Sequence, residues 1–238
     1  MKRVGLLGGS FNPVHKDHLD LGCYVKEKLN LDEILLIPNA APPHKNTCQV
    51  SYADRVSMLR LACQGLKNFK ISDIESDNSV PHYSFDTLKT LHEENPQTAF
   101  FFIMGLDSLL YLDKWHEGLK LIDYANLAVM CRKGYENKTI TPKIADFLKS
   151  CAVYDNDTHE FAAAAASRKG HCLMLSTSLH AVSSSAIRND IECYYQTSNQ
   201  KYLVEPKNRL EPAVLDYILK NRLYNDNVIM SPSPKTEK

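Results

Sequence analysis

The sequence of 238 residues lacks several features that would place it in a broad class. It has no apolar run near the ~20 residues that a membrane-spanning helix needs, and Gly8 and Gly9 end the first apolar stretch too early for a signal peptide. Its formal net charge is zero, from 28 basic and 28 acidic residues, so it has no electrostatic footprint for nonspecific nucleic-acid binding. We therefore expect neither a membrane nor a nucleic acid as a partner.

Paired cysteines are also missing. The seven cysteines are odd in number, scattered, and never in a Cys-x-x-Cys pair, which disfavours both a disulfide framework and a zinc cluster. We expect a reducing, cytoplasmic location. The sequence leaves the oligomeric state open, a homodimer included.

The composition and the order of apolar segments predict an α/β fold with a doubly wound parallel sheet. Hydrophobic residues make up 44% and charged residues 24%, as in a globular protein. Short apolar runs alternate with helical patterns, which is typical of βαβ units. The expected strands are 3–7, 33–38, 69–74, 99–104, 126–131 and 172–175, and the expected helices are 18–29, 52–66, 83–94, 115–122, one opening at 182–188, and 211–219.

The length favours a single domain over residues 1–224, with a helical C-terminal part at about 183–224. Residues 134–170 have no readable pattern, and their alanine run at 162–166 is helix-prone without being amphipathic. The polar, proline-rich stretch 225–238 is expected to be a flexible tail.

The most informative segment is Gly8-Gly9-Ser10-Phe11-Asn12-Pro13-Val14-His15-Lys16-Asp17-His18, which follows the first strand. Glycines allow a sharp turn and a close approach of backbone to a ligand, and amides at a helix N-terminus point toward an anion. His15 and His18 are three residues apart and share a helix face, so both can meet one phosphate. We expect a phosphate site that includes Gly8, Gly9, Ser10 and Phe11.

This segment resembles the phosphate-binding signature of the nucleotidyltransferase superfamily, which usually reads His-x-Gly-His. Asp17 stands where that family has glycine, and a carboxylate there would lie close to the expected triphosphate. Asp17→Gly is therefore expected to tighten ATP binding. The residues by themselves leave three alternatives open: histidines on the surface or in the core, a metal pair completed by Asp17, or a helix start at which Asp17 interacts with the dipole.

Further motifs resemble the bacterial nicotinate mononucleotide adenylyltransferases. Pro42-Pro43-His44-Lys45 follows the second strand, and in that family this loop approaches the phosphates. Tyr83-Ser84-Phe85-Asp86-Thr87-Leu88 is similar to the family's Tyr-Thr-x-Asp-Thr-Leu element, where Ser84 could serve as helix cap or turn hydroxyl beside the pyridine carboxylate.

Three more positions extend this resemblance. Gly105 and Asp107 match the family's Gly-x-Asp, which contacts the nucleotide. Trp115, the only tryptophan, matches the residue that stacks on the pyridine ring, although the residues themselves fit a half-buried helix anchor nearly as well. Arg132 stands in a segment that departs from the family's Arg-Pro-Gly, and we assign it a substrate contact.

The second strong signal is Val182-Ser183-Ser184-Ser185-Ala186-Ile187-Arg188, which is similar to the family's Ile-Ser-Ser-Thr-x-Ile-Arg. Serines at a helix start offer hydroxyls and free amides, and an arginine one turn later can grip phosphate oxygens with two hydrogen bonds. We expect Ser183, Ser184, Ser185 and Ile187 to line the substrate site.

The resemblance implies transfer of the adenylyl group of ATP to nicotinate mononucleotide, with release of pyrophosphate. The implied catalytic residues are His15, His18, Lys45 and Arg188, with Mg²⁺ carried on the ATP phosphates rather than in a dedicated metal site. Alternatives are the same reaction on nicotinamide mononucleotide, transfer to phosphopantetheine, and a nucleotide-binding relative with impaired catalysis.

Overall fold

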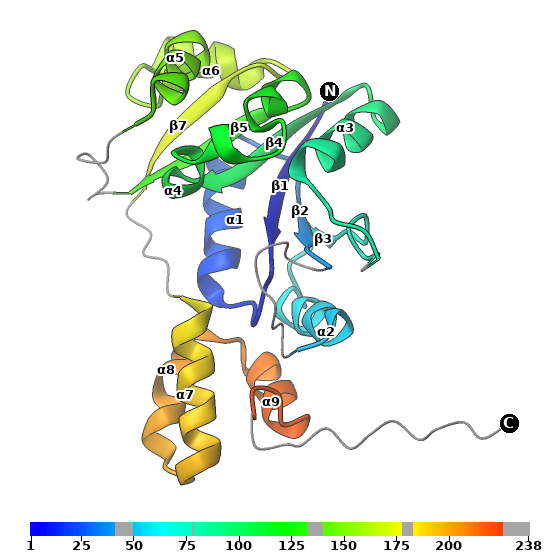
Figure 1. The fold of residues 1–238 in the computed structure, drawn as a ribbon, viewed down its shortest axis with the longest axis vertical. Helices are drawn as coiled ribbons and strands as arrows, with labels where there is room; N and C mark the ends of the chain where they lie inside the picture. Colours follow the sequence, from blue (N-terminus) through cyan, green and yellow to red (C-terminus); the bar gives the residue numbers. More distant parts are fainter. Residues whose placement is uncertain (41–49, 78, 133–139, 178–182, 226–238) are drawn as a thin grey trace, which may run out of the picture.

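A computed structural model describes residues 1–40, 50–77, 79–132, 140–177 and 183–225. Within these ranges the chain forms a seven-stranded sheet of order β3-β2-β1-β4-β5-β7-β6, in which every neighbouring pair is parallel (Figure 1). The strands are β1 (Lys2–Gly9), β2 (Glu33–Pro38), β3 (Phe69–Ile71), β4 (Thr98–Gly105), β5 (Asn126–Arg132), β6 (Ala152–Tyr154) and β7 (Cys172–Thr177). The predicted α/β class with a parallel sheet is confirmed.

The helices of the described residues connect these strands and then continue beyond them. They are α1 (Lys16–Lys28), α2 (Tyr52–Ala62), α3 (Ser84–Glu94), α4 (Leu106–Leu109), η1 (Leu112–Lys114), η2 (Gly118–Asp123), α5 (Pro142–Cys151), α6 (Thr158–Ala166), α7 (Ser184–Thr197), η3 (Gln200–Leu203), α8 (Val204–Arg209) and α9 (Pro212–Lys220). Figure 1 shows α7, α8 and α9 grouped at one end of the molecule, beyond the sheet.

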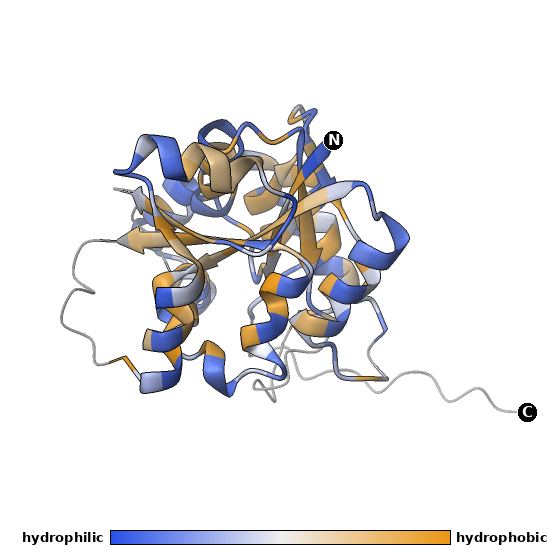
Figure 2. Cartoon of the chain, turned by 90° about the horizontal axis from the view of Figure 1, so that it is seen from above, coloured by the Kyte–Doolittle hydropathy of each residue, from blue (hydrophilic) through white to orange (hydrophobic). Residues whose placement is uncertain are grey.

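Helices cover both faces of the sheet because successive strand residues point to opposite sides. One face of β4 contributes Phe101 and Ile103 to a core shared with α1, α2, α6, α7 and α9. The other face contributes Phe100 and Phe102 to a core shared with α3, α4, η1, η2 and α5. The strands are accordingly apolar on both sides, and Figure 2 shows them mostly in orange between helices that carry blue surfaces.

Two predicted helices need correction. The segment 115–122 is not one α-helix: residues 115–117 follow the 3-10 turn η1 without helical structure, and the 3-10 helix η2 begins at Gly118. Glu117 has a left-handed φ of 48°, and Gly118 packs so tightly on the carbonyl of Leu112 that a Cβ would overlap it. The helix predicted at 52–66 ends at Ala62, and Gly65 takes a φ of 94° in the turn that follows.

The unreadable region 134–170 contributes α5, the edge strand β6 and α6 in its described part. Phe161, Ala164 and Ala165 of α6 are buried in the core, whereas the other alanines of the run are exposed, so the alanine run forms a surface helix with one face packed on the core. The predicted strand 69–74 is shorter than expected and ends at Ile71. No helix of the described ranges is long and apolar enough to cross a membrane.

Candidate functional site

The site lies at the ends of β1 and β4, which are neighbours in the middle of the sheet. Here the strand order reverses. From β1 the strands β2 and β3 extend one way, and β4 and the later strands extend the other way. Loops diverge at such a switch point and leave a crevice at the C-terminal ends of the strands. Gly8 and Gly9 end β1, and Gly105 ends β4, so all three border this crevice.

His15 and His18 meet at the start of α1. Their ring centroids are 3.8 Å apart, and His15 is the N-cap residue of the helix. The backbone amide of His15 donates to Nδ1 of His18 at 3.3 Å, and the amide of His18 donates to the carbonyl of His15 at 3.0 Å. A neutral His18 ring therefore carries its proton on Nε2, which leaves an N–H donor for a ligand.

Burial sets the protonation of both rings. Burial, together with the adjacent His15, lowers the pKa of His18 to about 3, so His18 is neutral at pH 7 in the free protein. Burial also lowers the pKa of His15, while the carboxylate of Asp17 opposes this change and Arg209 adds to it. The pair can offer hydrogen-bond donors to an anion without first carrying two positive charges.

The start of α7 is attached directly to the loop between β1 and α1. The guanidinium of Arg188 donates to the carbonyl of Asn12 at 2.7 Å and to Oγ of Ser185 at 2.9 Å. The hydroxyl of Ser184 donates to the carbonyl of Pro13 at 3.2 Å. The two motifs that the sequence singles out, nearly the whole chain apart, therefore form one structure.

The serines at this helix start have different local tasks. The Oγ of Ser183 caps α7 by accepting from the amide of Ser185 at 3.2 Å. Ile187 is buried at 1% exposure in the core beneath α7, and Phe11 is likewise buried at 1% with its ring edge-on to His18 at 5.1 Å. Ile187 and Phe11 thus hold the two segments together from beneath.

Two residues outside the predicted set brace the same loops. Arg55 on α2 is fully buried and donates to the carbonyls of Ser10 at 2.7 Å, Asn39 at 2.7 Å and Ala40 at 3.1 Å. The hydroxyl of Tyr224 donates to Oδ1 of Asn12 at 2.7 Å. The guanidinium of Arg55 therefore joins the loops after β1 and β2.

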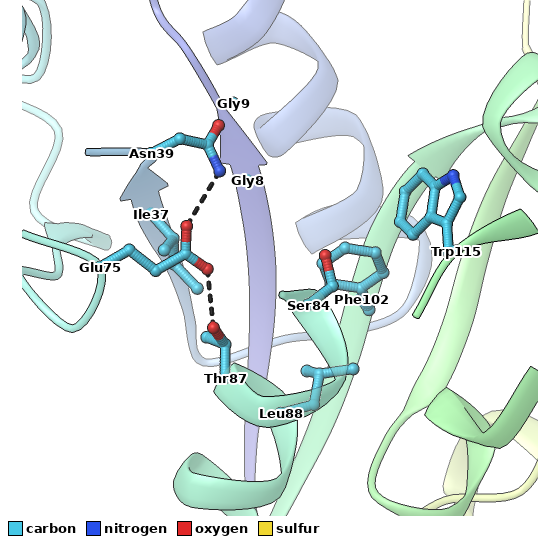
Figure 3. A pocket seen from close by; sticks show the side chains of 10 residues that line it. All are labelled: Gly8, Gly9, Ile37, Asn39, Glu75, Ser84, Thr87, Leu88, Phe102 and Trp115. Carbon is cyan, nitrogen blue, oxygen red and sulfur yellow. Dashed lines mark hydrogen bonds between the residues drawn. The ribbon is translucent and has the colours of Figure 1, made fainter. Parts of the chain in front are cut away.

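A cleft of about 160 Å³ opens beside the glycines of β1 (Figure 3). Its floor holds a buried carboxylate, Glu75, which accepts from Nδ2 of Asn39 at 2.9 Å and from Oγ1 of Thr87 at 2.7 Å. Figure 3 shows this hydrogen-bonded chain on one side and Trp115 on the other. The cleft is lined by Gly8, Gly9, Ile37, Asn39, Glu75, Ser84, Thr87, Leu88, Phe102 and Trp115.

The first turn of α3 faces this cleft through Ser84. The helix cap is Tyr83 rather than Ser84, and it makes no side-chain capping bond, which corrects the expected capping role of the serine. Amides of an uncapped first turn are available to an anion. The ring of Tyr83, 38% exposed, lies 4.6 Å from that of His116, and Asp107 is exposed on α4 just after Gly105.

Three predicted residues are not placed at this site by the described structure. His44 and Lys45 lie in 41–49, outside the described residues. Arg132 ends β5 at the same edge of the sheet, but its side chain is also outside the described set. Among the residues that are described, no group of three histidine, cysteine or acidic side chains has the arrangement of a metal site.

Comparisons with known proteins agree with the geometry. A family model described as cytidylyltransferase-like matches residues 6–190. A Shewanella sp. (strain MR-4) protein named "Probable nicotinate-nucleotide adenylyltransferase" is 35% identical over 222 residues, 93% of this chain and 99% of the relative. A protein of the same name from Shewanella frigidimarina (strain NCIMB 400) is 34% identical over 226 residues, 93% of this chain and 99% of its own length.

A solved structure has the same fold. The nicotinic acid mononucleotide adenylyltransferase of Plasmodium falciparum, solved as a complex with NaAD, matches with a TM-score of 0.70 and 20% identity. The match covers 94% of this chain and 98% of that one. At this level of identity the likeness concerns the fold.

Proposed function

The chain belongs to the cytidylyltransferase-like family and, within it, to the nicotinate-nucleotide adenylyltransferases, and on that premise we propose a site-by-site account of its reaction. The activity is transfer of the adenylyl group of ATP to nicotinate mononucleotide (NaMN), a step of NAD biosynthesis. We place ATP at the start of α1 and α7, and NaMN in the cleft beside α3.

One observation supports the ATP site above all others, namely the attachment of α7 to the loop that precedes α1. Arg188 and Ser184 contact the carbonyls of Asn12 and Pro13 at 2.7 Å and 3.2 Å, which brings the guanidinium to the same loop that carries His15 and His18. A helix N-terminus, a glycine turn and a planar cation together form a typical phosphate site.

The chemistry is a single displacement at phosphorus. An oxygen of the NaMN phosphate attacks the α-phosphorus of ATP, the bond from that phosphorus to the bridging oxygen breaks, and pyrophosphate leaves with the bonding electrons. No covalent enzyme intermediate is required. Catalysis of this kind depends on positioning and on stabilising negative charge as it develops.

His18 would act on this reaction as a neutral donor. Its Nδ1 is occupied by the amide of His15, so Nε2–H is the group that can donate to an oxygen of the α-phosphate. Arg188 would hold the leaving pyrophosphate, and Lys45 would assist from its loop, as the resemblance implies. A bound phosphate would favour the charged form of His15 and so add a positive charge when it is needed.

The cleft suits the pyridine end of NaMN. Trp115 offers an aromatic face on one side, and the amides at the first turn of α3, beside Ser84, would receive the negatively charged carboxylate. Tyr83 and Asp107 border the entrance, where an aromatic ring and a carboxylate can contact the ring and the ribose hydroxyls. A full negative charge gains more from a helix N-terminus than a neutral amide does, which favours NaMN over nicotinamide mononucleotide.

Magnesium is expected to arrive with ATP. The described residues contain no three-ligand cluster, and Mg²⁺ commonly takes its oxygens from substrate phosphates and water. Bound there, it would neutralise phosphate charge. We also place the protein in the cytoplasm, where free thiols persist, because every cysteine that the structure describes is a free thiol.

The test is an assay of pyrophosphate release with ATP, Mg²⁺ and one acceptor at a time: NaMN, nicotinamide mononucleotide or phosphopantetheine. The proposal predicts that NaMN has the highest kcat/KM, by at least about tenfold over nicotinamide mononucleotide, the equivalent of ~1.4 kcal/mol. A preference for another acceptor would overturn the assignment of the cleft. ATP binding without release for any acceptor would favour the alternative of a nucleotide-binding relative with impaired catalysis.

A further inference from the structure

Asp17 lies between two cationic partners rather than facing the phosphate site alone. Its Oδ1 is 3.5 Å from a guanidinium nitrogen of Arg209 on α8, and its Oδ2 is 3.7 Å from Nδ1 of His15. The side chain of Asp17 is only 15% exposed. Arg209 is further held by Glu205 at 3.4 Å, so the contact ties α1 to the C-terminal helices.

The ring of His15 has a buried polar atom that fits this carboxylate. The side chain is 4% exposed, and Nδ1 of His15 faces the amide of His18 in a capping-box arrangement but completes no hydrogen bond within the described residues. A buried nitrogen without a partner is costly, so a small ring or carboxylate movement that shortens 3.7 Å to a hydrogen bond is favourable. The carboxylate of Asp17 is the negatively charged acceptor that the described structure places beside this nitrogen.

We propose that Asp17 is a positioning residue, which accepts a hydrogen bond from Nδ1–H of His15 and thereby turns the opposite nitrogen, Nε2, toward the ATP phosphates, to which it donates when the ring is protonated. The inference rests on the proposed function for its phosphate ligand. In an imidazole the two nitrogens lie on opposite sides of the ring, so fixing one proton on Nδ1 directs the other nitrogen away from the carboxylate. Arg209 keeps the carboxylate in place.

The surrounding charges are consistent with this role. The titratable and charged groups near His15 are His18 and Asp17 on α1, Arg209 with its partner Glu205 on α8, and Arg188 on α7, which is bonded to the loop before His15. Of these, Asp17 favours the protonated form of His15, while burial and Arg209 oppose it. The carboxylate therefore offsets part of the decrease that burial causes in the pKa of His15.

These contacts reverse the expectation drawn from the sequence. A carboxylate in place of the usual glycine predicts repulsion of the triphosphate, so that its removal would tighten ATP binding. Arg209 instead compensates the charge of Asp17, and the carboxylate supports a phosphate ligand through His15. Removal of the carboxylate should weaken ATP binding.

The direct test is an NMR titration of the His15 ring in the ligand-free full chain, for wild type, Asp17→Asn and Asp20→Asn. Asp20 is an exposed carboxylate on the same helix and controls for a general loss of negative charge. Asp17→Asn should lower the pKa of His15 by about one unit, and Asp20→Asn should change it far less. Equal shifts in the two variants would overturn the proposal, whatever the protein's activity.

The kinetic test follows from the same expected decrease in the pKa of His15. Because less His15 is protonated in Asp17→Asn, the alkaline limb of kcat/KM for ATP should move to lower pH by about one unit. The loss should be about tenfold above the pKa of His15, which lies below its ordinary 6.5, and should shrink as the pH falls below that pKa. If Asp17→Asn folds poorly, Asp17→Gly can take its place, and we expect the same pH dependence from it. A loss of equal size at every pH would mean a merely structural role and would refute the proposal, whereas an inactive wild type with the expected NMR shift would refute only the proposed function.

Discussion

The guanidinium of Arg188 donates a hydrogen bond at 2.7 Å to the carbonyl oxygen of Asn12, a residue 176 positions earlier in the chain. The side-chain oxygen of Asn12 is in turn bonded by the hydroxyl of Tyr224 at 2.7 Å. One loop after the first strand therefore receives the start of α7 and the end of the described chain. This arrangement joins two distant sequence motifs in one structure, where we propose the phosphate site.

Replacement of Arg188 by lysine should keep the charge but lose the second hydrogen bond. A lysine is a point charge and cannot bridge the carbonyl of Asn12 and Oγ of Ser185 in one plane. We expect kcat/KM for ATP to fall about thirtyfold or more, equivalent to ~2 kcal/mol, with a smaller change in the melting temperature. Arg60→Lys, at an exposed position on α2, is the matched control and should keep wild-type kinetics.

The buried ring of His18 should make stability depend on pH. Its folded-state pKa of about 3 is below the ordinary 6.5, so the unfolded chain binds this proton more readily. Stability from this source is complete above pH 6.5 and is lost as the pH falls toward 3, with a cost of about 1–2 kcal/mol at pH 5. Urea unfolding at pH 7 and pH 5 should show a smaller loss for His18→Gln than for wild type.

The control for this measurement is His159→Gln, an exposed histidine on α6. Its loss of stability between pH 7 and pH 5 should equal that of wild type. If His18→Gln also loses as much stability as wild type between pH 7 and pH 5, His18 does not have the lowered pKa on which its role as a neutral donor depends.

The chain of hydrogen bonds through Glu75 should stabilise the cleft. Thr87→Val keeps the shape of the side chain but removes the hydroxyl that donates to Glu75 at 2.7 Å. One carboxylate oxygen is then buried without that donor, at a cost of about 1–3 kcal/mol in the free energy of unfolding, and KM for NaMN should rise. Thr197→Val, at the exposed end of α7, should cost much less, and equal costs would show that Glu75 has no special need of Thr87.

Trp115 should affect the pyridine substrate and not ATP. Stacking of a ring on an aromatic side chain contributes about 1–3 kcal/mol, so Trp115→Ala should raise KM for NaMN by about tenfold to hundredfold. KM for ATP should stay within about threefold of wild type. Trp115→Phe should recover much of the loss, and Tyr111→Ala, which removes an exposed aromatic nearby, should leave both KM values unchanged. Equal increases in both KM values would place Trp115 outside the NaMN site.

Strong local patterns account for the parts of the fold that the sequence predicts correctly. The predicted second strand has the bounds that the structure gives it, Glu33–Pro38, because a continuous apolar run ends there in a proline. The edge strand β6 escapes prediction because its three residues, Ala152–Tyr154, are too few to show a period. The residues after Trp115 suit a helix by their local pattern, and the close approach of Gly118 to Leu112 is visible only in three dimensions.

In the site, too, residues within strong local motifs are predictable from the sequence, whereas contacts between distant segments are not. Histidines at helical spacing after a glycine turn give a strong signal, and so does a run of serines before an arginine. Glu75 gives none, because it is one of several acidic and polar residues in a loop and only its burial, at 5% exposure, separates it from them. The pairing of Asp17 with Arg209 joins α1 to α8 and has no trace in local sequence.

The central claim is that His18 and Arg188 address one nucleotide at a single site. The most direct measurement is a crystal structure of the protein with Mg²⁺ and a non-hydrolysable ATP analogue. The claim predicts an oxygen of the α-phosphate within hydrogen-bond distance of Nε2 of His18, and the β- or γ-phosphate against the guanidinium of Arg188. A triphosphate bound elsewhere, or one that contacts only one of these two residues, would contradict it.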